Sequence, residues 1–307
     1  MAFYKFHPIS QEILEAKQIE LEKRGESLGV KGLAIIGVEG LNATLCGEPE
    51  VLKSFVKEAA EALGLPMDFS PKESWADMPP FRRMKVKIRE EIVTLGKPEV
   101  QPLPPGSEFH LSPDDWDKAM EDENVLVIDT RNWYETKIGK FKKAIDPNIE
   151  EFIEFSDYLK KSEIPKDKKV LIYCTGGIRC EKAIVEMHQQ GFNNVYQLDG
   201  GILNYLEQRP NKNFEGECFV FDHRVAIDQE LKPSQTYKLC PHCGQPGATQ
   251  IQCRKCECDA TVCDECVQAE HLQTCSKNCG YHYQRDPLTK GQQQAKNLVH
   301  VTNNHDS

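Results

Sequence analysis

The chain lacks the features of a membrane-spanning or exported protein. No apolar run approaches the roughly 20 residues that a bilayer crossing needs, and residues 1–7 lack the long apolar core of a signal peptide. We therefore expect a cytoplasmic protein with no membrane partner, in a compartment that keeps thiols reduced. The 13 cysteines among 307 residues then indicate metal binding or catalysis rather than disulfides.

An excess of basic residues is also absent. The net charge is −10, and segments 1–120, 121–216 and 217–307 are each net acidic. Because phosphate binding normally leaves a basic footprint, composition gives no support to a nucleic-acid partner. One local run, residues 82–89, alternates basic and apolar residues. Such a pattern is typical of a solvated strand face and less often marks a binding surface.

Motifs for common redox cofactors are missing as well. The sequence contains no nucleotide or flavin motif and no convincing two-histidine, one-carboxylate iron pattern. Oxygen chemistry usually needs a metal or cofactor, so nothing in the residues alone indicates an oxygenase. Nor do the residues predict a protein partner.

Four segments with different patterns follow one another. Residues 1–95 read as β-α-β-β-α-β, which predicts a ferredoxin-like (acylphosphatase-like) α+β domain. A proline-rich linker is expected over 96–112, with Pro98, Pro102, Pro104 and Pro105. Residues 113–215 alternate strands and helices, which predicts a parallel sheet covered on both faces. Residues 216–307 form a cysteine-rich region whose polar end, from Gln284, is expected to fray.

The most informative stretch is a cysteine loop between an apolar strand and a helix. Residues 170–173 predict a buried strand and 181–188 predict a helix, with Cys174 at the turn. Inward N–H groups and the helix N-terminus should lower the thiol pKa and make a thiolate nucleophile. The candidate catalytic residues are Cys174, Arg179 and Cys180, and the expected backbone cradle is Thr175, Gly176, Gly177 and Ile178.

The length of this loop limits the size of the group that it can bind. The spacing Cys174-x4-Arg179 is one residue shorter than a cysteine phosphatase loop needs. It fits one extra sulfur or oxygen atom, so it favours a persulfide whose charge the loop N–H groups stabilise. Cys180 is either a resolving thiol or a packing residue. Arg179 should organise the loop or bind an anion rather than pair with Glu181 or Asp129. For Asp129 and Arg131 we favour an internal ion pair.

A cluster of cysteines near the C-terminus predicts a metal site. Three Cys-x2-Cys knuckles within about forty residues are a strong zinc signal, and thiolates with no open position would make the zinc structural. A cross-brace of the knuckles and an adjacent pairing both remain open, and an iron–sulfur centre is a lesser alternative. The eight candidate ligands are Cys240, Cys243, Cys253, Cys256, Cys263, Cys266, Cys275 and Cys279.

Two resemblances add to these inferences. Residues 113–215 resemble a rhodanese domain through 127–131, Glu135, 139–144, the loop 174–179 and 198–201. The family's usual histidine is Lys140 here, and its aromatic after the paired glycines is Ile202.

Over residues 1–245, the order of 40–44, 131–135, 174–182 and 219–224 resembles the bacterial tRNA uridine hydroxylases. That resemblance implies 5-hydroxyuridine formation at wobble uridine 34 with molecular oxygen as co-substrate, an essential Cys174, and the tRNA anticodon stem-loop as partner. The 82–89 run and Trp75, Phe81 or Trp133 would then help to hold RNA. A thiosulfate-type sulfurtransferase and a zinc-dependent interaction module with a vestigial rhodanese domain are the competing hypotheses.

Overall fold

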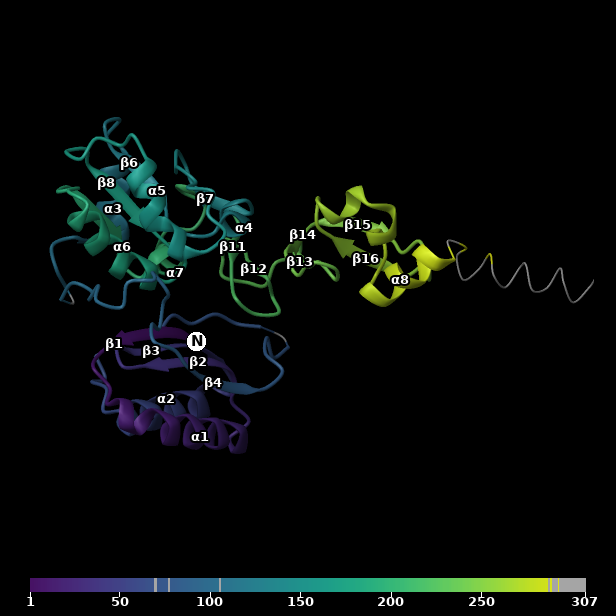
Figure 1. Cartoon of the computed structure of the whole chain (residues 1–307), viewed down its shortest axis with the longest axis horizontal. Helices are drawn as coiled ribbons and strands as arrows, with labels where there is room; N and C mark the ends of the chain where they lie inside the picture. The colour runs from purple at the N-terminus through teal and green to yellow at the C-terminus, as the bar shows by residue number, and fades with distance from the viewer. Residues whose placement is uncertain (69–70, 77, 105, 287, 289–291, 293–307) are drawn as a thin grey trace, which may run out of the picture. The chain divides into compact units, whose positions relative to one another are not determined.

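The computed structural model describes residues 1–68, 71–76, 78–104, 106–286, 288 and 292. It divides into two compact units, one made of 1–222 with 227–233 and the other of 223–226 with 234–307 (Figure 1). In the described residues, no helix is both long and apolar enough to cross a membrane.

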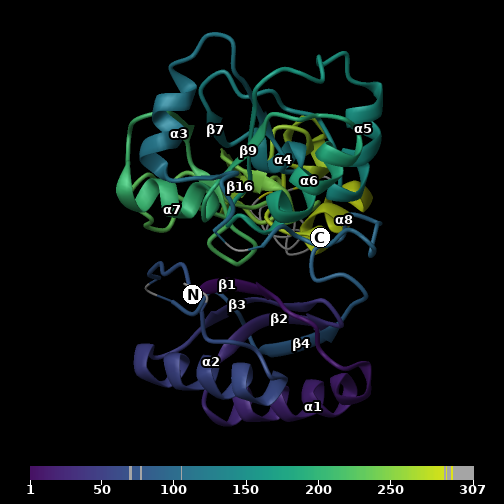
Figure 2. The same ribbon diagram turned by 90° about the vertical axis from the view of Figure 1, so that its left-hand side faces the viewer.

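The N-terminal part of the first unit is a four-stranded sheet covered by two helices. Its elements are β1 (Ala2–Phe6), α1 (Gln11–Ser27), β2 (Lys31–Gly37), β3 (Gly40–Cys46), α2 (Pro49–Leu63) and β4 (Met84–Ile88). The strand order is β1-β3-β2-β4, with only the β2–β4 pair parallel. Both helices lie on one face of the sheet (Figure 2). The predicted β-α-β-β-α-β domain is confirmed.

Local sequence explains why α2 forms and stops where it does. Pro49 stands at the start, where its missing N–H costs nothing. Leu52, Phe55 and Leu63 belong to the stripe that α2 buries against the sheet. Gly64 ends the helix in the left-handed conformation, with φ of 69°, which glycine adopts without strain.

The second part of this unit is a parallel sheet in the order β5-β9-β8-β6. Its strands are β5 (His110–Leu111), β6 (Leu126–Asp129), β8 (Val170–Tyr173) and β9 (Val195–Leu198). Around them lie α3 (Pro113–Met120), α4 (Trp133–Thr136), β7 (Gly139–Phe141), a 3-10 turn (Phe152–Glu154), α5 (Phe155–Lys161), α6 (Ile178–Gln189), α7 (Gly201–Gln208), β10 (Phe214–Gly216), β11 (Cys218–Phe219) and β12 (Ala226–Ile227).

Side chains on this sheet alternate between two cores because successive strand residues point to opposite faces. Leu171 and Tyr173 pack in one core with Trp116 of α3 and Tyr205 of α7. Val170 and Ile172 pack in the other with residues of α5 and α6. Figure 2 shows α3 and α7 on one side of the sheet and α5 and α6 on the other. The predicted doubly covered parallel sheet is therefore confirmed.

The segment predicted as a linker packs more closely than a spacer would. Val100 of this segment, and Leu95 just before it, are buried in the α5–α6 core, and His110–Leu111 adds the edge strand β5 beside β9. Phe109 packs against the α5–α6 core and Leu111 against the α3–α7 core. These apolar contacts on both faces explain why the C-terminal end of the predicted linker joins the sheet. Pro105 lies outside the described residues.

A buried ion cluster connects the two sheets of the first unit. The Lys182 ammonium of α6 is fully buried and lies 2.7 Å from a carboxylate oxygen of Glu39 and 2.7 Å from one of Glu91. Next to it, Tyr4 of β1 donates a hydrogen bond to Glu181 (2.8 Å). A buried charge is tolerated only when it is paired. These contacts therefore fix the start of α6, and the loop before it, to the N-terminal sheet.

The second unit is built from short elements around the cysteine knuckles. They are β13 (Lys238–Leu239), β14 (Pro246–Gly247), β15 (Thr249–Gln252), β16 (Asp259–Val262), two 3-10 turns (Cys266–Gln268 and Glu270–Leu272) and α8 (Lys277–Arg285). β13 pairs with β14 and β15 with β16, both antiparallel. Helix α8 includes Gln284, and most of the tail expected beyond it lies outside the described residues.

Candidate active site and metal centres

Cys174 lies at the carboxyl end of β8, in the loop that leads into α6. Ligands of open parallel sheets bind at this end of the strands. The thiol is buried, and the N–H of Gly177 donates a hydrogen bond to its sulfur at 3.1 Å. Gly177 is the N-cap of α6 with φ of 100°, a conformation that glycine reaches without a Cβ clash. The loop therefore aims a helix N-terminus at the sulfur.

The neighbours of Cys174 favour its thiolate. Burial raises the pKa of this thiol. A hydrogen bond from the Cys180 thiol, the Arg179 charge and loop N–H groups outweigh that effect and lower the pKa to about 7. Burial and the adjacent Cys174 raise the pKa of Cys180 well above its usual range. The pair thus divides into one thiolate and one thiol near neutral pH, with Cys180 also in contact with the Thr130 hydroxyl (3.7 Å).

Arg179 forms an ion pair with Glu135, a partner that the sequence pattern does not predict. Its Nη2 lies 2.7 Å from Oε1 of the fully buried Glu135, and Glu135 also accepts from the backbone N–H of Asn132 in a capping box at α4. The partner of Arg179 is thus neither Glu181 nor Asp129. The spacing Asn132-x2-Glu135 is typical of a capping box, and it is the sequence feature that could have indicated a structural role for Glu135.

The turn after β9 supports the loop from behind. The N–H groups of Ile202 and Leu203 donate to the carbonyls of Cys174 and Thr175, both at 3.0 Å. A Cβ at Gly201 would lie 2.7 Å from the backbone N of Gly177, so only glycine allows this approach. The predicted Asp129–Arg131 ion pair is present, buried and bidentate, with contacts of 2.7 to 3.2 Å.

We expect Cys174 to titrate near neutral pH. The measurement is the ultraviolet thiolate absorbance of the unchanged protein minus that of Cys174→Ser, recorded as a function of pH. Because a thiolate forms above the pKa, this difference should rise with a midpoint at about pH 7. Replacing Arg179 with Met removes a positive charge beside the sulfur and should move that midpoint to higher pH.

Cys46 is the matched control, because burial raises the pKa of its thiol above the usual range of a cysteine. The same difference measurement with Cys46→Ser should give a midpoint at clearly higher pH than that of Cys174. A Cys174 midpoint as high as that of Cys46 would contradict the electrostatics derived for the loop.

Three family descriptions match the chain in sequence order. Residues 1–92 match a UPF0176 acylphosphatase-like domain, 112–208 a rhodanese-like domain and 215–280 a rhodanese C-terminal region. A tRNA uridine(34) hydroxylase from Bdellovibrio bacteriovorus is 51% identical over 95% of this chain and 83% of its own length. This chain belongs to that family.

Other tRNA uridine(34) hydroxylases agree with this assignment. The enzyme of that name from Synechocystis sp. is 45% identical over 80% of this chain and 87% of its own length. A solved rhodanese-like domain from Anabaena sp. aligns with 36% of this chain and 80% of its own, with 18% identity and a TM-score of 0.31. The resemblance read from the sequence is confirmed at the level of the family.

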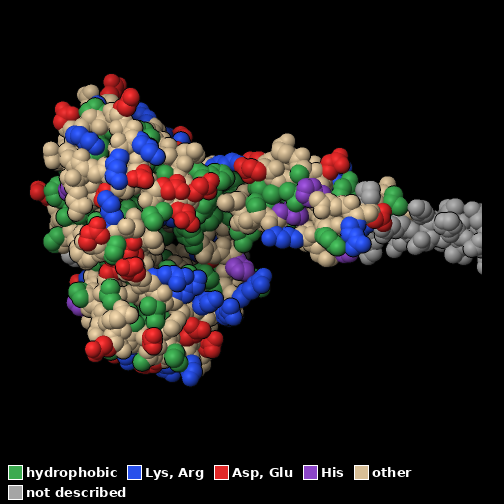
Figure 3. All heavy atoms as spheres, viewed as in Figure 1, with side chains coloured by type: hydrophobic (Ala, Val, Ile, Leu, Met, Phe, Trp, Pro, Cys, Tyr) green, Lys and Arg blue, Asp and Glu red, His purple; other side chains and the backbone are tan. Residues whose placement is uncertain are grey.

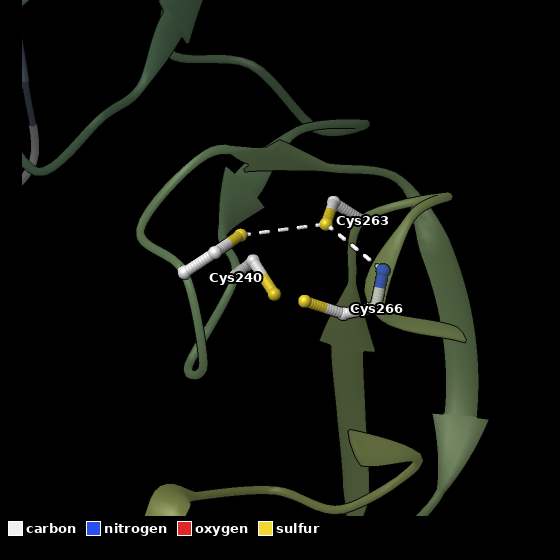
Figure 4. A group of neighbouring side chains, drawn as sticks. Cys240, Cys263 and Cys266 are labelled. Atoms are coloured by element: carbon white, nitrogen blue, oxygen red, sulfur yellow. Dashed lines mark hydrogen bonds between the residues drawn. The ribbon is translucent and has the colours of Figure 1, made fainter. Parts of the chain in front are cut away.

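In this tRNA uridine(34) hydroxylase family member, the eight predicted metal ligands form two groups of four. Cys240, Cys243, Cys263 and Cys266 make one group, and Cys253, Cys256, Cys275 and Cys279 make the other, with the sulfurs of each group within 4.8 Å of one another. This is the cross-braced arrangement. The sulfurs of Cys240, Cys263 and Cys266 point toward one centre (Figure 4). The remaining knuckle-region cysteine, Cys258, is exposed.

The chemistry of both groups fits a tetrahedral thiophilic ion. Zinc–sulfur bonds of about 2.3 Å in a tetrahedron place the sulfurs about 3.8 Å apart. The observed separations are similar, 3.5 Å for Cys243–Cys263, 3.4 Å for Cys256–Cys275 and 3.6 Å for Cys275–Cys279. Four sulfur ligands leave no open position, so such a site stabilises structure and does not bind substrate.

Proposed function

We propose that this protein hydroxylates uridine 34, the wobble nucleoside of tRNA, to 5-hydroxyuridine, with Cys174 as its reactive group. The observation that carries the proposal is the 51% identity to a tRNA uridine(34) hydroxylase across 95% of the chain. The pKa of about 7 for Cys174 supports the second part, because a thiolate is the reactive form of cysteine. Two structural zinc ions would stabilise the second unit.

The cysteine pair can balance the electrons of this reaction. Replacing C5–H of uracil with C5–OH removes two electrons from the base, whereas molecular oxygen takes up four to give one product oxygen and one water. The thiols of Cys174 and Cys180 supply the other two by forming a disulfide. Uridine, oxygen and two thiols then yield 5-hydroxyuridine, water and a disulfide. An external thiol would reduce the disulfide by exchange.

We place the RNA stem along β4, the strand of the basic run. Met84 and Val86 are buried, whereas Arg83, Lys85 and Arg89 are exposed. On the side of the molecule that Figure 3 shows, Lys and Arg side chains gather on part of the N-terminal domain. Phosphate contacts of this kind give affinity without sequence preference. We propose the anticodon stem-loop as the bound element, since its unpaired bases are accessible.

The competing hypotheses explain less of the molecule. A thiosulfate sulfurtransferase needs the persulfide loop but gives no role to the N-terminal sheet fixed to α6 by Lys182. A vestigial rhodanese domain in an interaction module would have no need to keep the pKa of a buried thiol near 7. A persulfide on Cys174 stays compatible with the loop, since the Gly177 N–H favours negative charge on either form of sulfur.

The purified protein tests this function directly. With a tRNA that carries uridine at position 34, air and a thiol reductant, we expect 5-hydroxyuridine in the digested nucleosides by mass spectrometry. A tRNA with cytidine at position 34 is the matched control and should stay unmodified, although it contains other uridines. No 5-hydroxyuridine in either RNA would overturn the proposal.

A further inference from the structure

Phe221 is an exposed aromatic side chain at the edge of the Cys174 loop. Its exposed fraction is 54%, although phenylalanine is usually buried. The guanidinium carbon of Arg179, a residue of that loop, lies 5.6 Å from the centre of the Phe221 ring. A partly exposed ring therefore lies beside Arg179, one of the groups that lower the pKa of Cys174.

The ring rests on other aromatic side chains rather than on a mobile loop. Phe219 meets it edge-on, with centroids 5.0 Å apart and planes at 84°, and Tyr134 meets Phe219 in the same manner at 5.4 Å. The Tyr134 hydroxyl accepts a hydrogen bond from Asn132 (2.8 Å). Tyr134 and Asn132 belong to the turn that also carries Glu135, the partner of Arg179. The surface is consequently pre-positioned, which lowers the cost of binding.

A hydrogen-bond donor beside the ring lacks an acceptor. Nη1 of Arg179 is buried and has no hydrogen-bond partner within the described part of the chain, while Nη2 of the same side chain binds Glu135. Buried polar atoms are rarely left unpaired, and an exception at a reactive site indicates a missing ligand group. A flat ring and an adjacent free donor match the two features of a nucleobase, its face and its carbonyl edge.

We propose that Phe221 is the stacking surface for the uracil that is modified, and that Nη1 of Arg179 donates to a carbonyl oxygen of the same base. The inference rests on the proposed function. An enzyme that reacts with a base must take it out of its stack, and an aromatic side chain then takes the place of the neighbouring bases of the RNA. In uracil, C4=O is bonded to C5, so a donor to O4 brings the reacting carbon to the Cys174 loop.

The test is a binding cycle that needs no turnover. One anticodon stem-loop RNA carries uridine at the wobble position, and a second carries an abasic site there. Phe221→Leu keeps an apolar side chain at an exposed position but removes the ring. We expect it to weaken binding of the uridine RNA about tenfold or more and to leave binding of the abasic RNA unchanged. Phe221→Trp should restore the preference for uridine.

Tyr281→Leu is the matched control. Tyr281 has the same exposed fraction, 54%, and an arginine at 5.5 Å, but that arginine is Arg285 of α8. In Tyr281→Leu, the ratio of the affinity for the uridine RNA to the affinity for the abasic RNA should equal the ratio in the unchanged protein. Equal losses for both RNAs in Phe221→Leu, or none, would overturn the stacking role. If the preference for the uridine RNA depends on Phe221 but no 5-hydroxyuridine forms, the proposed hydroxylation is wrong, whereas the proposed stacking of uracil on Phe221 is supported.

Discussion

Cys174→Ser is expected to abolish 5-hydroxyuridine formation, with a rate lower by on the order of a thousandfold or more. Serine has nearly the same size, so the buried position should tolerate it, but its hydroxyl does not ionise near neutral pH. The thiolate stabilised by Gly177, Arg179 and Cys180 would be gone. The measurement is the initial rate of nucleoside conversion in the tRNA that carries uridine 34.

Two further variants make this result specific. Cys46→Ser changes a half-buried cysteine at the end of β3 and should leave the rate unchanged. Cys180→Ser should slow turnover, and a high concentration of external thiol should partly restore it, because the external thiol can take the place of the second sulfur. Near-normal turnover of Cys174→Ser would contradict the catalytic assignment. Failure of thiol to help Cys180→Ser would contradict the disulfide step.

The second large effect is expected on removal of zinc. We expect about two zinc ions per chain by elemental analysis, and about one in Cys253→Ser, because that variant loses a buried ligand of one group only. Structural zinc supplies about 10–16 kcal/mol of folding free energy in small domains. A strong chelator should therefore unfold the second unit, which has only a small core around Val262 and the knuckles, while the first unit keeps its two sheets.

Cys258→Ser is the control for the zinc experiment. Cys258 lies within the knuckle region but outside both groups of four, and it is exposed. This variant should keep about two zinc ions and the same resistance to chelator. Less than one zinc per chain in the unchanged protein, or equal zinc loss in both variants, would contradict the assignment of ligands.

Much of the fold follows from local patterns. Apolar periodicity indicated the strands of both sheets except the edge strand β5, which lies in the predicted linker, and Pro49 and Gly64 mark the ends of α2 in the sequence. The cysteine loop was predictable because all its parts are adjacent in sequence. The knuckle spacing named eight ligands, but spacing alone left cross-braced and adjacent pairings open, since the pairing depends on how β15 and β16 fold back.

Contacts between segments that are distant in the chain could not be predicted from the sequence. Glu135 reaches Arg179 from α4, and Lys182 meets Glu39, in the turn between β2 and β3, and Glu91, just after β4, both more than ninety positions away. A lysine in a helix pattern is ordinarily solvated, so nothing marked this one as buried. Phe221 lies in the run 219–224, which contributed only to the family resemblance, and its exposure and its place beside Arg179 come from the structure alone.

The origin of the inserted oxygen tests the central claim most directly. The protein is supplied with tRNA carrying uridine 34, a thiol reductant and oxygen-18 gas in ordinary water, and the digested nucleosides are weighed by mass spectrometry. We expect 5-hydroxyuridine carrying one oxygen-18 atom, and none from Cys174→Ser. Unlabelled 5-hydroxyuridine would place the oxygen source in water. A sulfur-containing nucleoside in place of 5-hydroxyuridine would mean that the loop transfers sulfur and that the hydroxylase proposal is wrong.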